Sequence, residues 1–246
     1  MNDLFRPEYA LSVGVAVALA LLFPVTKHLR GGERKSYYTL QTITLLGAVL
    51  GAKLSVLVGD LNWPFVPLPD WHTILVSGRS VTGALILGFL AAEGAKPLLG
   101  YTMPPNDRFA TLLPFSFAIG RVGCLLSGCC RGLPWNGPWA ITYSDGIPRH
   151  PAQAYELLFQ VAIGLIFLAL LRRGLLFGRL FSVYLIAYGA FRFGNEFLRE
   201  TPRTWGPLSA YQGLCLVMIA LGATFLVKRT FWPPETWKSL APDPAV

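Results

Sequence analysis

Charge is scarce in this sequence. Only 14% of its 246 residues are Asp, Glu, Lys or Arg, whereas a soluble domain carries roughly 25%. The deficit runs along the whole chain, and 53% of the residues are hydrophobic. This composition is typical of a membrane protein, and no stretch between the apolar segments is long enough for a second domain. We therefore predict a single transmembrane domain over residues 1–246.

Several other features are missing. The net charge is +8, but no basic stripe interleaved with aromatic residues is present, which argues against nucleic-acid binding. The start, MNDLFRPEYA, lacks the basic region of a cleavable signal peptide, so we expect the first apolar segment to be retained. The four cysteines are not evenly spaced as in a secreted disulfide scaffold.

Seven apolar segments are long enough to cross a bilayer core of about 30 Å. They cover residues 9–25, 38–58, 81–99, 109–127, 151–171, 180–198 and 208–227. We predict an all-α polytopic membrane protein of about seven transmembrane helices, with loops 59–80 and 128–150 as ordered caps over the outer leaflet. An orientation with the N-terminus outside and the C-terminus cytoplasmic places twelve Lys and Arg inside and six outside, as the positive-inside rule requires.

The first candidate site lies in the sixth segment. Tyr188, Arg192, Glu196 and Arg199 are spaced by 4, 4 and 3 residues, so they share one helix face. Charged side chains in the hydrocarbon region face protein or a wet cavity. The stripe lies near the predicted outer surface, which favours a site for an anionic lipid headgroup. The alternative is that an Arg192–Glu196 pair only fixes helix packing.

Two further motifs lie near the same surface. Gly120 and Gly123 flank Arg121, and glycines let a helix pack closely or unwind toward a ligand. A guanidinium suits a phosphate, although Arg121 could instead pair with Glu156 or Glu196. Arg149 and His150 precede the fifth segment, where a helix N-terminus favours an anion; His150 could be a general base or a structural donor.

In these motifs the sequence resembles the prolipoprotein diacylglyceryl transferase family. Gly120-Arg121-Val122-Gly123 is similar to the start of the family signature, and Arg149-His150-Pro151-Ala152-Gln153-Ala154-Tyr155-Glu156 to its second element. The stripe within residues 188–199 resembles the third element, and residues 208–212 resemble the opening of the last helix. These elements follow one another in family order.

The resemblance implies a seven-helix enzyme that moves a diacylglyceryl group from phosphatidylglycerol to a cysteine thiol of a lipoprotein precursor, with no cofactor or metal. It implies a catalytic set of Arg192, Arg121 and Glu196, the arginines stabilising the leaving phosphate. The remaining residues would bind substrate: Tyr188, Arg199, Arg149, His150, Thr82, Gly120 and Gly123. The sequence departs from the family at two places. Thr82 stands where the family has a histidine, and Cys124, Ser127 and Cys129 replace Asn, Asn and Glu.

The cysteines Cys124, Cys129 and Cys130 leave four interpretations open. They could pack as small residues, form a redox pair, provide a nucleophilic thiolate, or bind a soft metal. The function of the whole chain is likewise open to three interpretations. Besides the enzyme of a plasma membrane, it could be a related phospholipid-binding or thiol-sensing protein without this activity, or a transferase with another acceptor.

Overall fold

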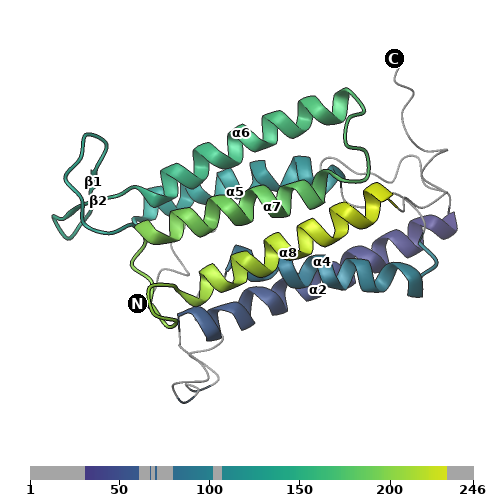
Figure 1. Cartoon of the computed structure of the whole chain (residues 1–246), viewed down its shortest axis with the longest axis horizontal. Helices are drawn as coiled ribbons and strands as arrows, with labels where there is room; N and C mark the ends of the chain where they lie inside the picture. Colours follow the sequence, from purple (N-terminus) through teal and green to yellow (C-terminus); the bar gives the residue numbers. More distant parts are fainter. Residues whose placement is uncertain (1–30, 61–66, 68–69, 71–79, 102–106, 232–246) are drawn as a thin grey trace.

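The protein is a bundle of antiparallel helices. The computed structural model describes residues 31–60, 67, 70, 80–101 and 107–231. Its helices are α2 Gly31–Gly59, α4 Val81–Leu98, α5 Asp107–Ser127, α6 Ala152–Arg172, α7 Leu180–Asn195, the 3-10 helix η3 Glu196–Leu198 and α8 Ala210–Phe231. Figure 1 shows their long axes running roughly side by side, with the segment between α5 and α6 at one end of the bundle.

Five of these helices are long and apolar enough to cross a membrane. The spans are Lys35–Gly59, Val81–Leu98, Phe109–Ser127, Ala152–Arg172 and Ala210–Thr230. The predicted segment 180–198 is present as α7 and η3, but α7 has only 16 residues. The predicted segment 9–25 lies outside the described residues. The helical membrane fold is confirmed, and the count of about seven spans stays a prediction.

Helices α2 and α4 approach each other through glycines. A Cβ placed on Gly51 of α2 would lie 2.2 Å from the carbonyl oxygen of Gly83 on α4. Gly47, one turn earlier, faces the backbone of Leu87 in the same way. In a bilayer no hydrophobic effect drives helices together, and small residues spaced by four let the helix backbones pack closely instead. The start of α4, including Thr82, is thereby held against the end of α2.

The core is aromatic and lies among α4, α7 and α8. Phe89 stacks on Phe181 with ring centroids 5.5 Å apart, and Tyr184 stacks on Tyr188 at 5.8 Å. Both tyrosines and Met218 are fully buried. By contrast, the outward face of α2 exposes large apolar side chains, which suits contact with lipid: Leu45, Leu46, Val49 and Leu50.

At the far end of the bundle, polar contacts fix where α7 begins. The carboxylate of Asp107 accepts the backbone N–H of Leu180 at 3.0 Å and also that of Gly178. An anion at a helix N-terminus is favoured by the exposed N–H groups.

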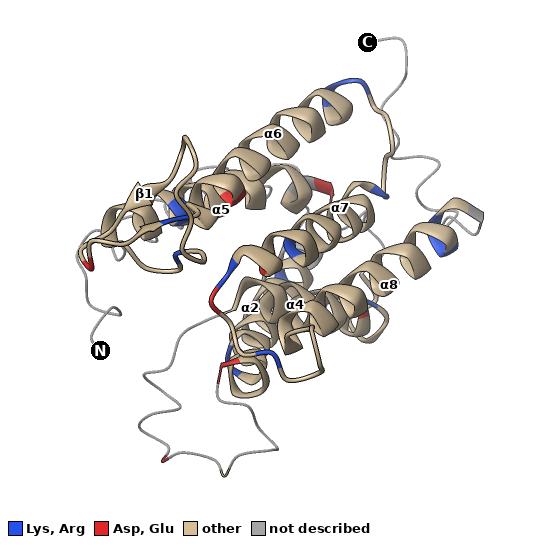
Figure 2. Ribbon diagram, turned by 60° about the vertical axis from the view of Figure 1, so that its left-hand side comes forward, with Lys and Arg blue, Asp and Glu red and all other residues tan. Residues whose placement is uncertain are grey.

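Arg229 of α8 pairs with Glu93 of α4 at 2.6 Å. Figure 2 shows that charged residues gather at helix ends and connections, while most of each helix carries none.

The loop 128–150 is ordered, as predicted, but it is not helical. Strand β1 Ile141–Thr142 pairs antiparallel with β2 Pro148–Arg149. Isolated bridges join Gly132 to Arg199 and Pro134 to Arg149, so the loop is tied to the end of η3. The all-α prediction therefore holds for the bundle, and a short hairpin covers one end of it. The other predicted cap, residues 59–80, lies mostly outside the described residues.

Candidate active site

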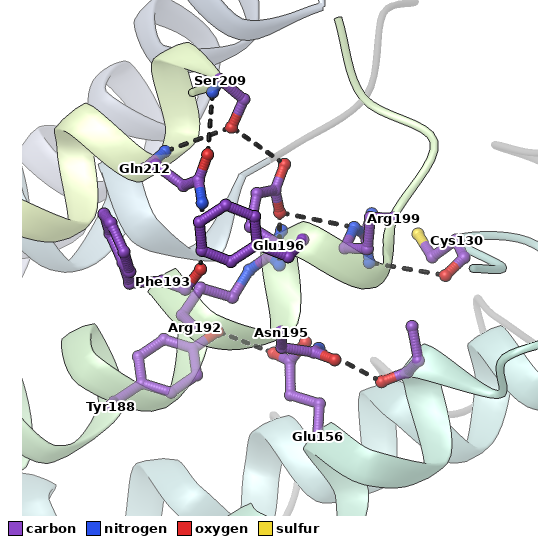
Figure 3. A network of polar contacts seen from close by, with 12 residues as sticks. Cys130, Glu156, Tyr188, Arg192, Phe193, Asn195, Glu196, Arg199, Ser209 and Gln212 are labelled. Atoms are coloured by element: carbon purple, nitrogen blue, oxygen red, sulfur yellow. Dashed lines mark hydrogen bonds and ion pairs between the residues drawn. The ribbon is translucent and has the colours of Figure 1, made fainter. Parts of the chain in front are cut away.

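The polar residues predicted from α7 converge at the hairpin end of the bundle. Glu196 is fully buried; its Oε2 lies 2.6 Å from Nη1 of Arg192 and 3.6 Å from Nε of Arg199. Its other oxygen, Oε1, accepts a hydrogen bond from the Ser209 hydroxyl at 3.3 Å. Figure 3 shows these side chains pointing toward one another between η3 and α8. The α-helix ends before Arg199, yet both arginines still reach one carboxylate.

A second carboxylate, Glu156 of α6, occupies the neighbouring position. Its Oε1 lies 2.7 Å from Nη2 of Arg121 on α5 and accepts the Tyr188 hydroxyl at 2.6 Å. Glu156 and Tyr188 are both completely buried. The sequence suggested two ion pairs as alternatives to ligand binding by these arginines. The structure contains both of them, Arg121–Glu156 and Arg192–Glu196.

Sequence reasoning did not place Glu156 in the site. Its signal was present, because it closes the motif that begins at Arg149. The same is true of Gln212, whose Oε1 accepts hydrogen bonds from the Ser209 N–H at 2.9 Å and from Arg203 Nη1 at 3.1 Å. Residues 208–212 carried a resemblance, but no residue from them entered the predicted site.

The site has spare hydrogen-bonding capacity. Three arginines face two buried carboxylates, and a third carboxylate, Asp60, interacts electrostatically with Arg199. Among the described residues, Glu156 Oε2 makes no contact with hydrogen-bond geometry, whereas Arg192 Nη1 and Glu196 Oε2 are paired with each other at 2.6 Å. Buried polar groups without partners are rare in folded proteins, and each calls for an explanation such as a ligand or a catalytic role. The guanidinium groups of this cluster can bind an anionic group.

Arg149 and His150 lie within the hairpin. Arg149 pairs with Glu200 and, at 3.2 Å, with Asp145, and the Glu200 hydrogen bond raises the pKa of its guanidinium. The backbone N–H of Ile147 lowers the pKa of Asp145, with a smaller effect from Arg131. His150 stacks on Trp135 with 4.2 Å between the centroids. The anion-binding role predicted for both residues stays a prediction.

The remaining predicted residues are scattered around the cluster. Thr82 is 1% exposed in the first turn of α4, at the hairpin end. Gly120 and Gly123 lie inside α5, which is one continuous α-helix to Ser127; the unwinding that the glycines suggested does not occur. A Cβ on Gly120 would meet nothing within 4 Å among the described residues.

The three clustered cysteines meet at the end of α5. Their Sγ atoms all lie within 4.8 Å of one another, and all three are free thiols. Hydrogen bonds from the Cys124 and Cys129 thiols, together with Arg199, lower the pKa of Cys130. The fourth, Cys215, is buried in α8.

The fold and the site define a polytopic membrane protein with a buried, arginine-rich polar centre at one end of its bundle. The family model of the prolipoprotein diacylglyceryl transferases matches residues 7–228. The chain therefore belongs to the prolipoprotein diacylglyceryl transferase family, which confirms the resemblance seen in its sequence.

Curated relatives agree with this assignment. A phosphatidylglycerol–prolipoprotein diacylglyceryl transferase of Polynucleobacter asymbioticus is 34% identical over 75% of this chain and 74% of its own length. The enzyme of the same name from Cupriavidus metallidurans is 32% identical over 74% and 72%. That of Clostridium tetani is 28% identical over 86% and 88%.

Proposed function

We propose that this protein is a membrane-embedded transferase that moves a diacylglyceryl group from phosphatidylglycerol to a cysteine thiol of a lipoprotein precursor. Membership of the family supports the reaction. The observation that supports this site is the buried cluster of three arginines and two glutamates at the hairpin end of the bundle. Its guanidinium groups suit the negatively charged phosphate of phosphatidylglycerol.

The chemistry needs a leaving group stabilised as its charge develops. The acceptor sulfur attacks the glycerol carbon that carries the phosphate, the C–O bond breaks, and glycerol phosphate departs with the electron pair. Fixed guanidinium groups in a site of low dielectric stabilise that charge without reorganising. We assign this role to Arg192 and Arg121. Glu196, which also contacts Arg199, pairs with Arg192. Glu156, which accepts the Tyr188 hydroxyl, pairs with Arg121.

We also propose an orientation in a bacterial plasma membrane. The hairpin end would face outside and the C-terminus the cytoplasm. Arg172 and Arg173 at the end of α6, and Lys228 and Arg229 at the end of α8, all lie at the opposite end of the bundle. Basic residues concentrate on the cytoplasmic side of membrane proteins, and lipoprotein precursors would then meet the site after crossing the bilayer.

The test is transfer to a defined acceptor. The full chain is purified in detergent, incubated with phosphatidylglycerol and a peptide that copies the cysteine region of a lipoprotein precursor, and analysed by mass spectrometry. We expect a diacylglyceryl increment on the peptide cysteine. Arg192→Ala should reduce the rate at least about 100-fold, the usual loss for one preorganised donor to a developing anion.

The matched control is Arg173→Ala, which removes an exposed arginine at the opposite end of the bundle. It should leave the rate unchanged. Full activity of Arg192→Ala would contradict the phosphate role. No increment with wild-type protein, while a relative works in parallel, would instead favour a lipid-binding protein or another acceptor.

A further inference from the structure

The cysteine cluster is built by the way α5 ends. The Gly128 N–H bonds to the Leu125 carbonyl at 3.3 Å, and the Cys129 N–H to the Cys124 carbonyl at 3.2 Å. Gly128 has the left-handed φ of 66° that this helix ending requires. The same ending normally brings an apolar side chain two residues beyond the helix back onto its last turn. Here the side chain two residues beyond the helix is that of Cys129, and the facing side chain on the last turn is that of Cys124. Cys129 is therefore folded back over Cys124.

The third thiol is held from the neighbouring elements. Cys130 also has a left-handed φ, 57°, which is strained for a residue with a side chain. Its carbonyl accepts a hydrogen bond from Arg199 Nη1 at 3.4 Å, and the Cys129 carbonyl accepts one from the Gln153 amide. A strained conformation that persists because its surroundings fix it is typical of functional sites.

The resulting geometry fits one thiophilic metal ion. A Zn–S bond is about 2.3 Å, so three thiolates around one Zn²⁺ stand about 3.8–4.0 Å apart. The three Sγ atoms already lie within 4.8 Å of one another, so adjustments on the order of 1 Å complete the set. Donors to the sulfurs are in place as well: Ser127 Oγ lies 3.1 Å from Cys129 Sγ, and Arg121 Nη1 lies 3.8 Å from Cys124 Sγ. Such outer contacts orient ligands and balance their charge.

A nucleophilic thiolate that carries the diacylglyceryl group is excluded on chemical grounds. If one of these thiolates took the diacylglyceryl group from the lipid, the product would be a thioether. An alkyl group leaves a thioether sulfur only with great difficulty, so the group would not pass on to a second thiol. The cluster is therefore not an intermediate carrier for this reaction.

We propose that Cys124, Cys129 and Cys130 together bind one soft divalent cation of the zinc class, leaving its fourth position open to an incoming thiolate. Three protein ligands with one open position is the arrangement of catalytic zinc sites. Three thiolates and one dication carry a net charge of −1. Arg121, which contacts Cys124 Sγ, and Arg199, which holds the Cys130 carbonyl, place positive charge beside them.

The open position gives the site a role that rests on the proposed function. A thiol that coordinates such an ion is deprotonated outright, and its proton passes to water. The sulfur electron pair then forms the new C–S bond while the C–O bond breaks and glycerol phosphate leaves. The metal keeps its oxidation state throughout. No side-chain base is then needed at Thr82, because the metal takes over the task of generating the thiolate.

Metal binding is tested without any turnover. The full chain in detergent is reduced, stripped with a chelator and titrated with Co²⁺ as a spectroscopic probe, then with Zn²⁺ in competition. We expect one ion per chain and a thiolate-to-metal charge-transfer band. Cys129→Ser and Cys130→Ser, which change half-buried loop positions, should each weaken binding at least about 10-fold, the low end of losses at metal sites.

Cys215→Ser is the matched control, because it removes a thiol outside the cluster, and it should bind like wild type. Absence of metal uptake by the reduced protein would overturn the proposal. So would undiminished uptake by the triple Cys→Ser variant, or a disulfide among the three cysteines that forms as readily in the metal-loaded protein as in the stripped protein.

The open position is tested with the acceptor peptide. The Co²⁺ band should shift on adding the cysteine peptide and should not shift with its Cys→Ser counterpart. If the Co²⁺ band of the bound ion shifts with neither peptide, the proposal of an open coordination position is overturned. A shift without diacylglyceryl transfer would uphold the metal site while contradicting the proposed function. Equal transfer rates in stripped and loaded protein would show that the ion has no part in generating the thiolate.

Discussion

Glu156 and Arg121 form a buried ion pair between α6 and α5, with 2.7 Å between Oε1 and Nη2. The glutamate side chain is fully buried and the arginine side chain is 12% exposed. Breaking such a pair by removing one partner leaves an uncompensated charge, whereas removing both charges is often nearly neutral. The pair therefore has a structural effect that can be separated from its effect on the reaction.

Glu156→Gln should destabilise the protein by about 3–5 kcal/mol, because Arg121 loses its counter-charge. The double variant Arg121→Met with Glu156→Gln should regain most of that stability. Its transfer activity should stay low, because the proposed phosphate contact is gone. Unfolding by denaturant in mixed micelles and the peptide assay measure the two effects. A double variant as unstable as the single one would contradict the coupling between these residues.

The contact of α2 with α4 provides a second prediction. Gly51→Leu should disrupt the bundle, because even a Cβ at this position would lie 2.2 Å from the Gly83 carbonyl oxygen. Overpacking that forces backbone apart costs typically 1–3 kcal/mol and occasionally more. Gly94→Ala on α4 is the control, since a Cβ there meets nothing within 4 Å among the described residues. Thermal unfolding in detergent should show a lower midpoint for Gly51→Leu alone.

Helix positions could be predicted from the sequence because the bilayer imposes a minimum apolar length. The predicted segment 180–198 coincides with α7 and η3 together. The start of α2 was missed: the helix begins at Gly31, before the apolar run. Residues that continue a helix beyond the hydrocarbon region carry no apolar signal.

The site was predicted less completely, for a different reason. Spacing along one helix placed Arg192 and Glu196 on one face, and the structure pairs them. Spacing along a helix does not decide which charges meet across helices, so the sequence left Glu156 and Glu196 as alternative partners of Arg121, and the structure pairs Arg121 with Glu156. The contact of Arg199 with the Cys130 carbonyl likewise joins two segments that only the fold brings together.

The hairpin should respond to acid. The pKa of Asp145 is lowered below 3.8, first by the Ile147 N–H and then by Arg131 and Arg149. A carboxylate with a lowered pKa in the folded state stabilises that state fully above its unfolded pKa, and the stabilisation disappears as pH falls through the folded pKa. The protection factors for hydrogen exchange in residues 131–149, which correct for the intrinsic pH dependence of exchange, should therefore be steady above about pH 5 and fall below about pH 4.

Asp145→Asn should lower the protection factors of the hairpin at neutral pH and flatten their acid dependence. Because Asp145 is exposed, the change should be small and should shrink in high salt. An unchanged acid dependence in this variant would assign the effect to another group, of which Glu200, the second partner of Arg149, is the nearest candidate.

His150 offers the clearest separation of a structural role from a catalytic one. Its ring stacks on Trp135 with an interplanar angle of 10°, and its Nδ1 lies 3.1 Å from the Tyr155 hydroxyl. His150→Phe keeps the stacking and removes the ring nitrogens, whereas His150→Gln removes the ring. If the ring only packs the hairpin against α6, His150→Phe should transfer diacylglyceryl groups within about threefold of wild type, far from the 10²–10⁴-fold loss of a missing general base. The dependence of kcat on pH should also keep its shape. A loss of about 100-fold in His150→Phe, with one limb of that profile gone, would make His150 the base and remove the need for a metal to generate the thiolate.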